Sequence, residues 1–191
     1  MYTTNTALVP ALDAQDHVQG NAQAAVSLIE YGDYECPACG LWNPLLIQLV
    51  AERGTGIAYA FREYPLVQIH QNAMISAQAA EAANLQGKFW QMHDLLYAKQ
   101  QEWENAPTAD IITLYFDGYA KSLGLDVARF DADIASDAVK ARVQRDIATG
   151  DAARLDHTPT FFINGKQINN PSSYVELIAD LDAAAASSTQ R

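Results

Sequence analysis

Apolar residues near the start of the chain fall into runs that predict two strands joined by a helix. The apolar run at residues 25–31 is short and compact, which is typical of a buried strand. Over residues 36–53, leucines recur at helical spacing, and two glycines follow them. A second short apolar run occupies residues 57–61. The pattern therefore predicts a strand, a helix and a second strand in succession.

A long helical block separates these strands from a second strand-forming region. Residues 71–150 carry apolar residues at helical spacing and contain no convincing strand. Strand-forming residues return at 160–163, and the Asn164-Gly165 pair favours a two-residue hairpin because both residue types tolerate positive φ. Residues 166–168 then supply the partner strand, and residues 174–185 form a last helix.

This order of elements predicts an α/β protein with a mixed sheet flanked by helices. A strand–helix–strand unit followed by a hairpin and a helix builds such a sheet, with helices on both faces. Residues 25–70 and 151–186 make up this core, and residues 71–150 form a helical domain inserted after the second core strand. Residues 1–24 show no clear period, so we expect an extended arm with one short edge strand near residues 7–10.

Composition and charge exclude several classes of function. Apolar types make up 49% of the 191 residues, yet no run approaches the ~20 apolar residues of a membrane span. A formal charge of −11 disfavours nucleic acid and anionic membranes as partners. The sequence from Met1 shows no signal peptide. The chain as written is therefore expected in the cytoplasm, or in the periplasm or another extracytoplasmic compartment if its N-terminus has been trimmed.

The two cysteines of the chain, Cys36 and Cys39, are spaced Cys-x-x-Cys at the start of the first predicted helix. A disulfide scaffold or a four-ligand zinc site needs more cysteines, so the pair favours redox chemistry over two incidental buried thiols. At this spacing the sulfurs lie on one side of a helix and can bridge. Cys36 meets the free N–H groups of the helix start, which favour a thiolate, so it is expected to attack. Cys39 is then the resolving thiol.

Two motifs far apart in the sequence resemble the DsbA-like branch of the thioredoxin superfamily, and a third segment is similar to the helical insertion of that branch. The similarity extends from Asp16 to Leu181. The three segments are Tyr31-Gly32-Asp33-Tyr34-Glu35-Cys36-Pro37-Ala38-Cys39, Thr158-Pro159-Thr160-Phe161-Phe162-Ile163-Asn164-Gly165 and Phe89-Trp90-Gln91-Met92-His93-Asp94-Leu95-Leu96.

The resemblance implies a thioredoxin fold with a helical domain inserted after the second core strand. It also implies a cis bond between Thr158 and Pro159, in a loop that faces the sulfurs beside Pro37 and Ala38 and can pair with an extended peptide. Glu30 matches an acid that lies behind the second cysteine and exchanges protons with it, with a pKa raised by burial. From the residues alone, a glutamate at a strand end such as Glu30 is usually a solvated residue, and Pro159 could simply start a strand.

Some positions depart from the strongly oxidising members of this branch. Those members have Pro-His between the cysteines, and the histidine stabilises the thiolate; this chain has Pro37-Ala38. His157 stands where many relatives have glycine. It either supplies part of the thiolate stabilisation that the missing histidine would give, or is an exposed loop residue. Asp33 and Glu35 oppose ionisation of Cys36 if they lie close to it in space. We therefore expect a less oxidising redox poise than that of Pro-His relatives.

These observations predict a protein thiol–disulfide oxidoreductase whose Cys36 and Cys39 cycle between dithiol and disulfide. Whether it oxidises, reduces or isomerises depends on its potential against that of the compartment. The expected partners are protein or peptide thiols and disulfides and a redox recycling partner, and the disulfide itself replaces a cofactor. No metal site is expected, because His70 and His93 are isolated from other ligand types. The alternatives are a non-catalytic module on the same fold, either a peptide-binding chaperone or a metal site of both cysteines and a histidine, and a glutathione-linked transferase or isomerase.

Overall fold

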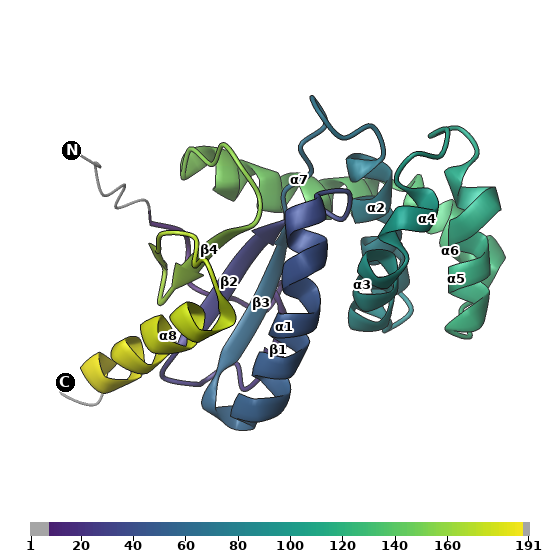
Figure 1. The fold of residues 1–191 in the computed structure, drawn as a ribbon. Helices are drawn as coiled ribbons and strands as arrows, with labels where there is room; N and C mark the ends of the chain where they lie inside the picture. The colour runs from purple at the N-terminus through teal and green to yellow at the C-terminus, as the bar shows by residue number, and fades with distance from the viewer. Residues whose placement is uncertain (1–7, 189–191) are drawn as a thin grey trace.

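The computed structural model describes residues 8–188, in which five strands form one mixed sheet (Figure 1). The strand order is β1-β3-β2-β4-β5. Strands β2 and β3 run parallel, so they need a crossover connection, whereas the other neighbouring pairs are antiparallel. The strands are β1 His17–Gly20, β2 Ser27–Gly32, β3 Ala58–Glu63, β4 Thr160–Ile163 and β5 Lys166–Gln167.

Helices cover both faces of the sheet, and a group of further helices lies to one side of it, at the right of Figure 1. The crossover between β2 and β3 is α1, which packs on one face together with α8, while α7 packs on the other face. Among the described residues, no helix has the length and apolar character needed to cross a membrane. The helical segments are α1 Pro37–Arg53, η1 Gly54–Gly56, α2 Ala73–Asn84, α3 Phe89–Ala98, α4 Gln100–Trp103, η2 Ile112–Phe116, α5 Asp117–Ser122, α6 Val127–Ile134, α7 Asp137–Ala152 and α8 Tyr174–Ser188.

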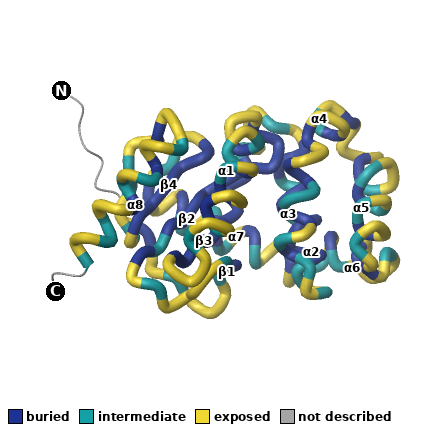
Figure 2. Tube along the Cα trace, turned by 60° about the horizontal axis from the view of Figure 1, so that its bottom comes forward, coloured by how far each residue is buried: buried dark blue, intermediate teal, exposed yellow. Residues whose placement is uncertain are grey.

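Strand β2 is buried along almost its whole length (Figure 2). Successive side chains of a strand point to opposite faces of the sheet. Leu28 belongs to the core shared with α1 and α8. Ile29 and Tyr31 belong to the core on the α7 side. Glu30 has the parity of Leu28, so its carboxylate lies on the side of α1, the helix that carries both cysteines.

A third core joins the inserted helices to the cysteine-bearing turn. Met92 and Leu96 of α3 and Trp103 of α4 are fully buried in it, and the same cluster includes Cys36 and Cys39. The inserted helices therefore pack directly against the turn that holds the thiols.

The predicted fold class is confirmed, and the strands and helices predicted for the core form close to their predicted limits. The segment 1–24 differs from the prediction of an arm with an edge strand near 7–10. The strand that forms there is β1, and Leu8 contributes one isolated bridge. Asp16, just before β1, binds the buried Arg62 of β3, which fixes this segment against the sheet. Residues 1–7 lie outside the described residues, and the predicted end of the insertion at residue 150 falls inside α7.

Candidate active site at the start of α1

The loop after β2 brings both cysteines to the start of α1. Cys36 is the N-cap residue, with φ −71 and ψ 119, and Pro37 follows at the first helical turn. Proline suits that position because its missing N–H would have no helical partner. Cys36 therefore lies where unpaired N–H groups and the helix dipole favour an anion. Cys39 lies one turn further along; it is 0% exposed, against 7% for Cys36.

The two thiols are free in this structure, and their pKa values are shifted in opposite directions. A hydrogen bond from the Cys39 thiol is the main reason why the pKa of Cys36 falls to about 5; Thr158 and the backbone N–H of Ala38 add to this effect, while burial opposes it. Burial raises the pKa of Cys39, and its hydrogen bond to Cys36 and the charge of Glu30 raise it further. At neutral pH Cys36 is thus the nucleophilic thiolate and Cys39 the protonated thiol.

The loop before β4 lies against the Cys36 sulfur. The Thr158–Pro159 bond is cis, as the sequence predicts. In its protonated form, the Cys36 thiol donates a hydrogen bond to the Thr158 carbonyl over 3.4 Å. The Thr158 hydroxyl is buried and has no hydrogen-bond partner among residues 8–188, so it is free to donate to a Cys36 thiolate. The structure therefore brings Thr158 to the thiol pair from a segment far along the chain.

Glu30 is buried behind the thiols, on the face of β2 that α1 covers. Burial raises the pKa of Glu30 from 4.5 to about 8, with a further increase from the charge of Cys36. The Tyr59 hydroxyl donates to one carboxylate oxygen over 2.6 Å, and the other oxygen has no partner among the described residues. Glu30 can therefore hold or release a proton near neutral pH, as a proton-transfer group requires. Tyr59 is absent from the residues predicted for the site. The usable signal is that its strand, β3, follows β2 after one α-helix and pairs with it in parallel, which places Tyr59 near Glu30.

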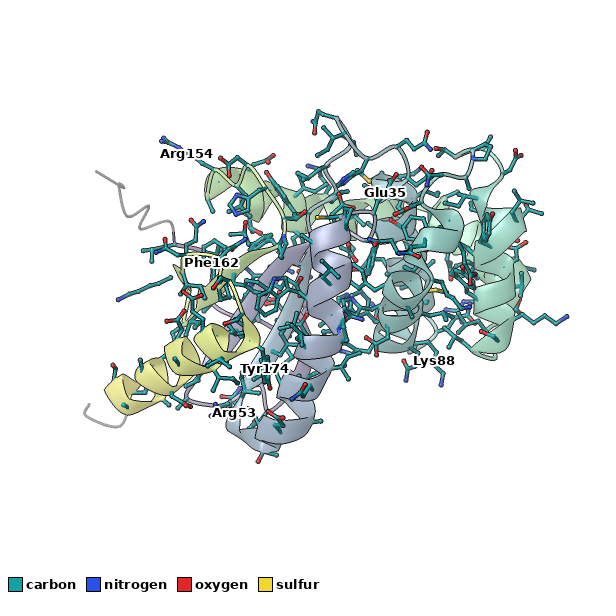
Figure 3. The ribbon with its side chains drawn as sticks, viewed as in Figure 1. Glu35, Arg53, Lys88, Arg154, Phe162 and Tyr174 are labelled. Atoms are coloured by element: carbon teal, nitrogen blue, oxygen red, sulfur yellow. The ribbon has the colours of Figure 1, made fainter. Side chains whose placement is uncertain are left out.

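The sequence predicts that Asp33 and Glu35 oppose ionisation of Cys36 only if they lie close to it in space, and in the structure both carboxylates contact other groups. Asp33 contacts His70 Nδ1 at 2.7 Å and accepts the backbone N–H of Glu35 at 2.9 Å. Glu35, labelled in Figure 3 beside the start of α1, accepts the backbone N–H of Asn72. Burial also raises the pKa of Glu35. Neither acid is among the main groups that shift the pKa of Cys36.

Three of the residues predicted for the site are exposed on the surface of the protein. Pro37 and Ala38 are exposed at the start of α1. His157 is half-exposed, and its Nδ1 lies 2.7 Å from the carboxylate of Asp156. His157 is not among the main groups that lower the pKa of Cys36. The structure therefore pairs this imidazole with its neighbour in sequence rather than with the sulfur.

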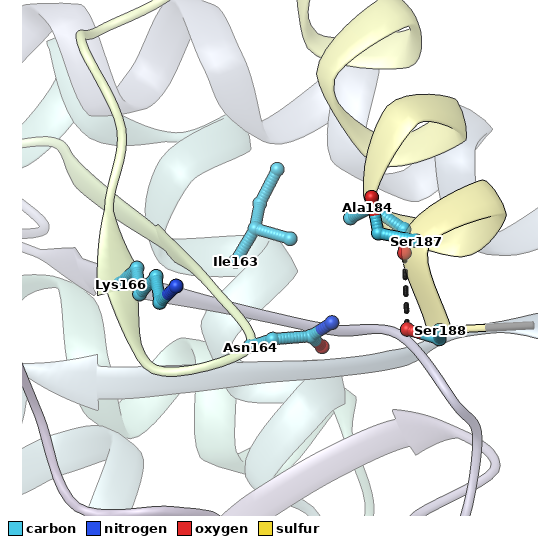
Figure 4. Close-up of a pocket in the computed structure, with 6 residues that line it drawn as sticks. All are labelled: Ile163, Asn164, Lys166, Ala184, Ser187 and Ser188. Carbon is cyan, nitrogen blue, oxygen red and sulfur yellow. Dashed lines mark hydrogen bonds between the residues drawn. The ribbon is translucent and has the colours of Figure 1, made fainter. Parts of the chain in front are cut away.

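One further histidine serves the core, and one hollow lies away from the thiols. His93 is buried between the Tyr34 hydroxyl and Asn43, and burial lowers its pKa to about 3. Across the described part of the chain, no group of three or more His, Cys, Asp or Glu side chains is arranged to hold a metal ion. A hollow between the β4–β5 hairpin and the end of α8 contains none of the site residues (Figure 4). Its lining residues are Ile163, Asn164, Lys166, Ala184, Ser187 and Ser188.

Comparison with known sequences identifies relatives along nearly the whole chain. The sequence profile of the thioredoxin family matches residues 13–183. A protein named Na(+)/H(+) antiporter NhaA 1 from Salinispora arenicola is 39% identical over 184 residues, which is 96% of this chain but 27% of that protein. The protein named Na(+)/H(+) antiporter NhaA 3 from Salinispora tropica is 38% identical over the same shares. The chain thus spans 27% of the length of these relatives.

Solved structures with low sequence identity share the fold. BdbD from Bacillus subtilis, in its oxidised form, has a TM-score of 0.78 at 21% identity, covering 94% of this chain and 96% of that one. Alpha-DsbA1 from Wolbachia pipientis has a TM-score of 0.80 at 18% identity, covering 98% of both chains. A thioredoxin-like oxidoreductase from Silicibacter pomeroyi has a TM-score of 0.72 at 22% identity, covering 91% of this chain and 94% of that one. The chain therefore belongs to the thioredoxin family, and its fold is the DsbA-like form with inserted helices.

Proposed function

We propose that this protein is a thiol–disulfide oxidoreductase that exchanges disulfides with protein or peptide thiols through Cys36 and Cys39. The observation that carries the proposal is the asymmetry of the two neighbouring thiols. Cys36 has a pKa of about 5, and the pKa of Cys39 is raised by burial. An attacking thiol and a resolving thiol need these opposite properties.

In the oxidising direction, a substrate thiolate attacks the Cys36 sulfur of the Cys36–Cys39 disulfide. A mixed disulfide forms, the bond between the two cysteines breaks, and Cys39 leaves as a thiolate that takes a proton from Glu30. A second substrate thiolate then attacks the substrate sulfur of the mixed disulfide, and Cys36 leaves as a stabilised thiolate. Two substrate thiols have become one disulfide, and the cysteine pair holds the two electrons. The reverse sequence reduces a substrate disulfide.

The substrate in this proposal is an extended segment of polypeptide beside the Thr158–Pro159 loop, where backbone groups can pair with a peptide. The cysteines themselves carry the electrons, so the proposal includes no cofactor, but it needs a recycling partner that restores the starting redox state. The ion transport named for the sequence relatives is not part of the proposal, because the matched segment is 27% of their length.

Replacement of each cysteine by serine tests this mechanism. Cys36→Ser removes the attacking sulfur, so the rate of insulin reduction in the presence of a reductant should fall to background. Cys39→Ser leaves a thiolate without its resolving partner, so mixed disulfides with substrate should accumulate and be visible by non-reducing electrophoresis and mass spectrometry. Normal turnover by Cys39→Ser would rule out the two-thiol mechanism.

A further inference from the structure

One side chain from the inserted helices binds the backbone of the turn that carries Cys36. Gln100, the first residue of α4, donates from Nε2 to the Tyr34 carbonyl over 2.7 Å and to the Cys36 carbonyl over 2.9 Å. Gln100 is buried, with 7% of its surface exposed. Both N–H groups of its amide are therefore used on the residues just before α1.

Gly40, in the second turn of α1, provides the space that this amide needs. A Cβ atom at position 40 would lie 2.7 Å from Gln100 Oε1 and 3.3 Å from its Cδ. The Gly40 backbone N–H donates to the Cys36 carbonyl over 3.1 Å, so one carbonyl oxygen is bound by α1 and by α4. An alanine at position 40 would meet the end of a flexible side chain, so the amide of Gln100 would move first.

We propose that Gln100 is a positioning residue of the dithiol site: its amide fixes the backbone of Tyr34 and Cys36, and so holds the Cys36 sulfur beside Cys39 and Thr158. The inserted helices then set the reactivity of the thiol, although they contribute no group that reacts. This inference rests on the proposed oxidoreductase function and adds a residue to it. If the loop loosens, Cys36 loses part of the geometry that stabilises its thiolate, and its pKa moves towards that of an ordinary thiol.

Gln100→Met tests the proposal because methionine has a similar length and no N–H donor. In the reduced protein, titration of thiolate absorbance should show the Cys36 pKa higher than in the wild type by about one unit, a tenfold change in the ionisation equilibrium. Gln101→Met, at the exposed neighbouring position, should leave the pKa unchanged. A purely structural role for Gln100 would lower the melting temperature and leave the Cys36 pKa at its wild-type value, which would overturn the proposal.

If Gln100→Met folds poorly, Gly40→Ala tests the same contact with Gln100 left in place, and a double-mutant cycle with Gln100→Ala shows whether Gln100 mediates the effect. Gly40→Ala should reproduce the rise in the Cys36 pKa, because the new methyl group displaces the Gln100 amide. In a Gln100→Ala background the space is empty, so Gly40→Ala should add no further shift. Equal shifts from Gly40→Ala in both backgrounds would show that Gln100 does not mediate the effect.

The same titrations separate this inference from the function on which it rests. A wild-type protein with an ordinary Cys36 pKa and no exchange activity would refute the oxidoreductase function, and the role of Gln100 with it. A wild-type protein with a low Cys36 pKa and normal exchange, together with unshifted variants, would refute the role of Gln100 alone.

Discussion

At the scale of single residues, Glu30 is a buried acid whose proton changes both the chemistry and the stability of the protein. Its pKa rises from 4.5 to about 8 in the folded protein, because burial disfavours the charged form. Between these values the unfolded chain is ionised and the folded protein keeps the proton. The folded state binds more protons, so this group lowers the free energy of unfolding as pH rises, by roughly 1.4 kcal/mol per pH unit.

Glu30→Gln removes this titration. The variant should gain stability relative to the wild type as pH rises from 5 to 8, by about 2 kcal/mol or more over that range in urea unfolding. The new amide nitrogen lacks a hydrogen-bond acceptor, which lowers the free energy of unfolding by an amount that does not depend on pH. The quantity to compare is therefore the change in the free energy of unfolding with pH. The variant should also reduce insulin more slowly, because in that direction Cys39 must give up its proton to attack the mixed disulfide, and the new glutamine cannot accept it.

Glu52→Gln is the matched control for Glu30→Gln, because Glu52 is an exposed acid on the same helix as the cysteines. The free energy of unfolding of Glu52→Gln, relative to that of the wild type, should not increase from pH 5 to pH 8. If Glu30→Gln and Glu52→Gln gave the same pH slope, Glu30 would not hold its proton in the folded protein.

At the scale of elements, the close packing of β2 against β3 and α3 has a testable consequence at Gly32. A Cβ atom there would lie 2.3 Å from the ring of Phe61 and 3.0 Å from the Tyr97 hydroxyl. Both side chains are buried, so Gly32→Ala should lower the free energy of unfolding by about 1–3 kcal/mol through overpacking. Urea denaturation measures this loss.

Gly56→Ala, in the turn after α1, is the control for Gly32→Ala. A Cβ atom at Gly56 meets nothing within 4 Å, and its φ lies outside the left-handed region. This variant should be as stable as the wild type or slightly more stable, because alanine restricts the unfolded chain. Equal losses in the two variants would contradict the packing described for Gly32.

The elements that could be predicted from the sequence are those fixed by local signals. The Asn164-Gly165 turn forms with φ values of 49 and 77, as its residue types require. The Cys-x-x-Cys pair lies at a helix start because Pro37 follows Cys36. Strand β1 was not predicted, because its short sequence has little alternation and its place depends on antiparallel pairing with β3.

Within the site, the residues that could not be predicted are those brought in by tertiary contacts. Asp33 could be found close to Cys36 in the sequence, but the direction of its carboxylate depends on His70, which lies beyond β3. Gln100 reaches Cys36 from the inserted helices, and no local pattern marks it. Local sequence patterns are sufficient to find the two cysteines. Which charged groups shift the pKa values of these cysteines depends on contacts between segments far apart in the sequence.

At the scale of the whole molecule, the low pKa of Cys36 links the redox state to stability. In the reduced protein the Cys36 pKa is about 5, against 9.0 for an ordinary thiol. Between these values the unfolded chain binds the proton and the folded protein does not. The reduced form therefore gains stability as pH rises and loses it as pH falls towards 5, by roughly 1.4 kcal/mol per pH unit. The oxidised form has no thiol to titrate.

The free energy of unfolding of the reduced form, minus that of the oxidised form, should therefore increase from pH 5 to pH 8. Urea unfolding with and without dithiothreitol at several pH values measures this difference. The contribution of Glu30 is present in both forms and largely cancels. Reduced Cys36→Ser should lack the increase, and parallel pH profiles for the two wild-type forms would contradict the linkage.

The central claim is the asymmetry of the two thiols, and the pH dependence of alkylation tests it most directly. The reduced protein is treated briefly with iodoacetamide at pH values from 3 to 10, and mass spectrometry identifies the modified cysteine. The account predicts modification of Cys36 with a midpoint near pH 5 and no modification of Cys39 below about pH 9. A midpoint near the ~3.5 of the strong oxidant DsbA would refute the intermediate redox poise. Equal reaction of both cysteines, with a midpoint near the 9.0 of an ordinary thiol, would contradict the account as a whole.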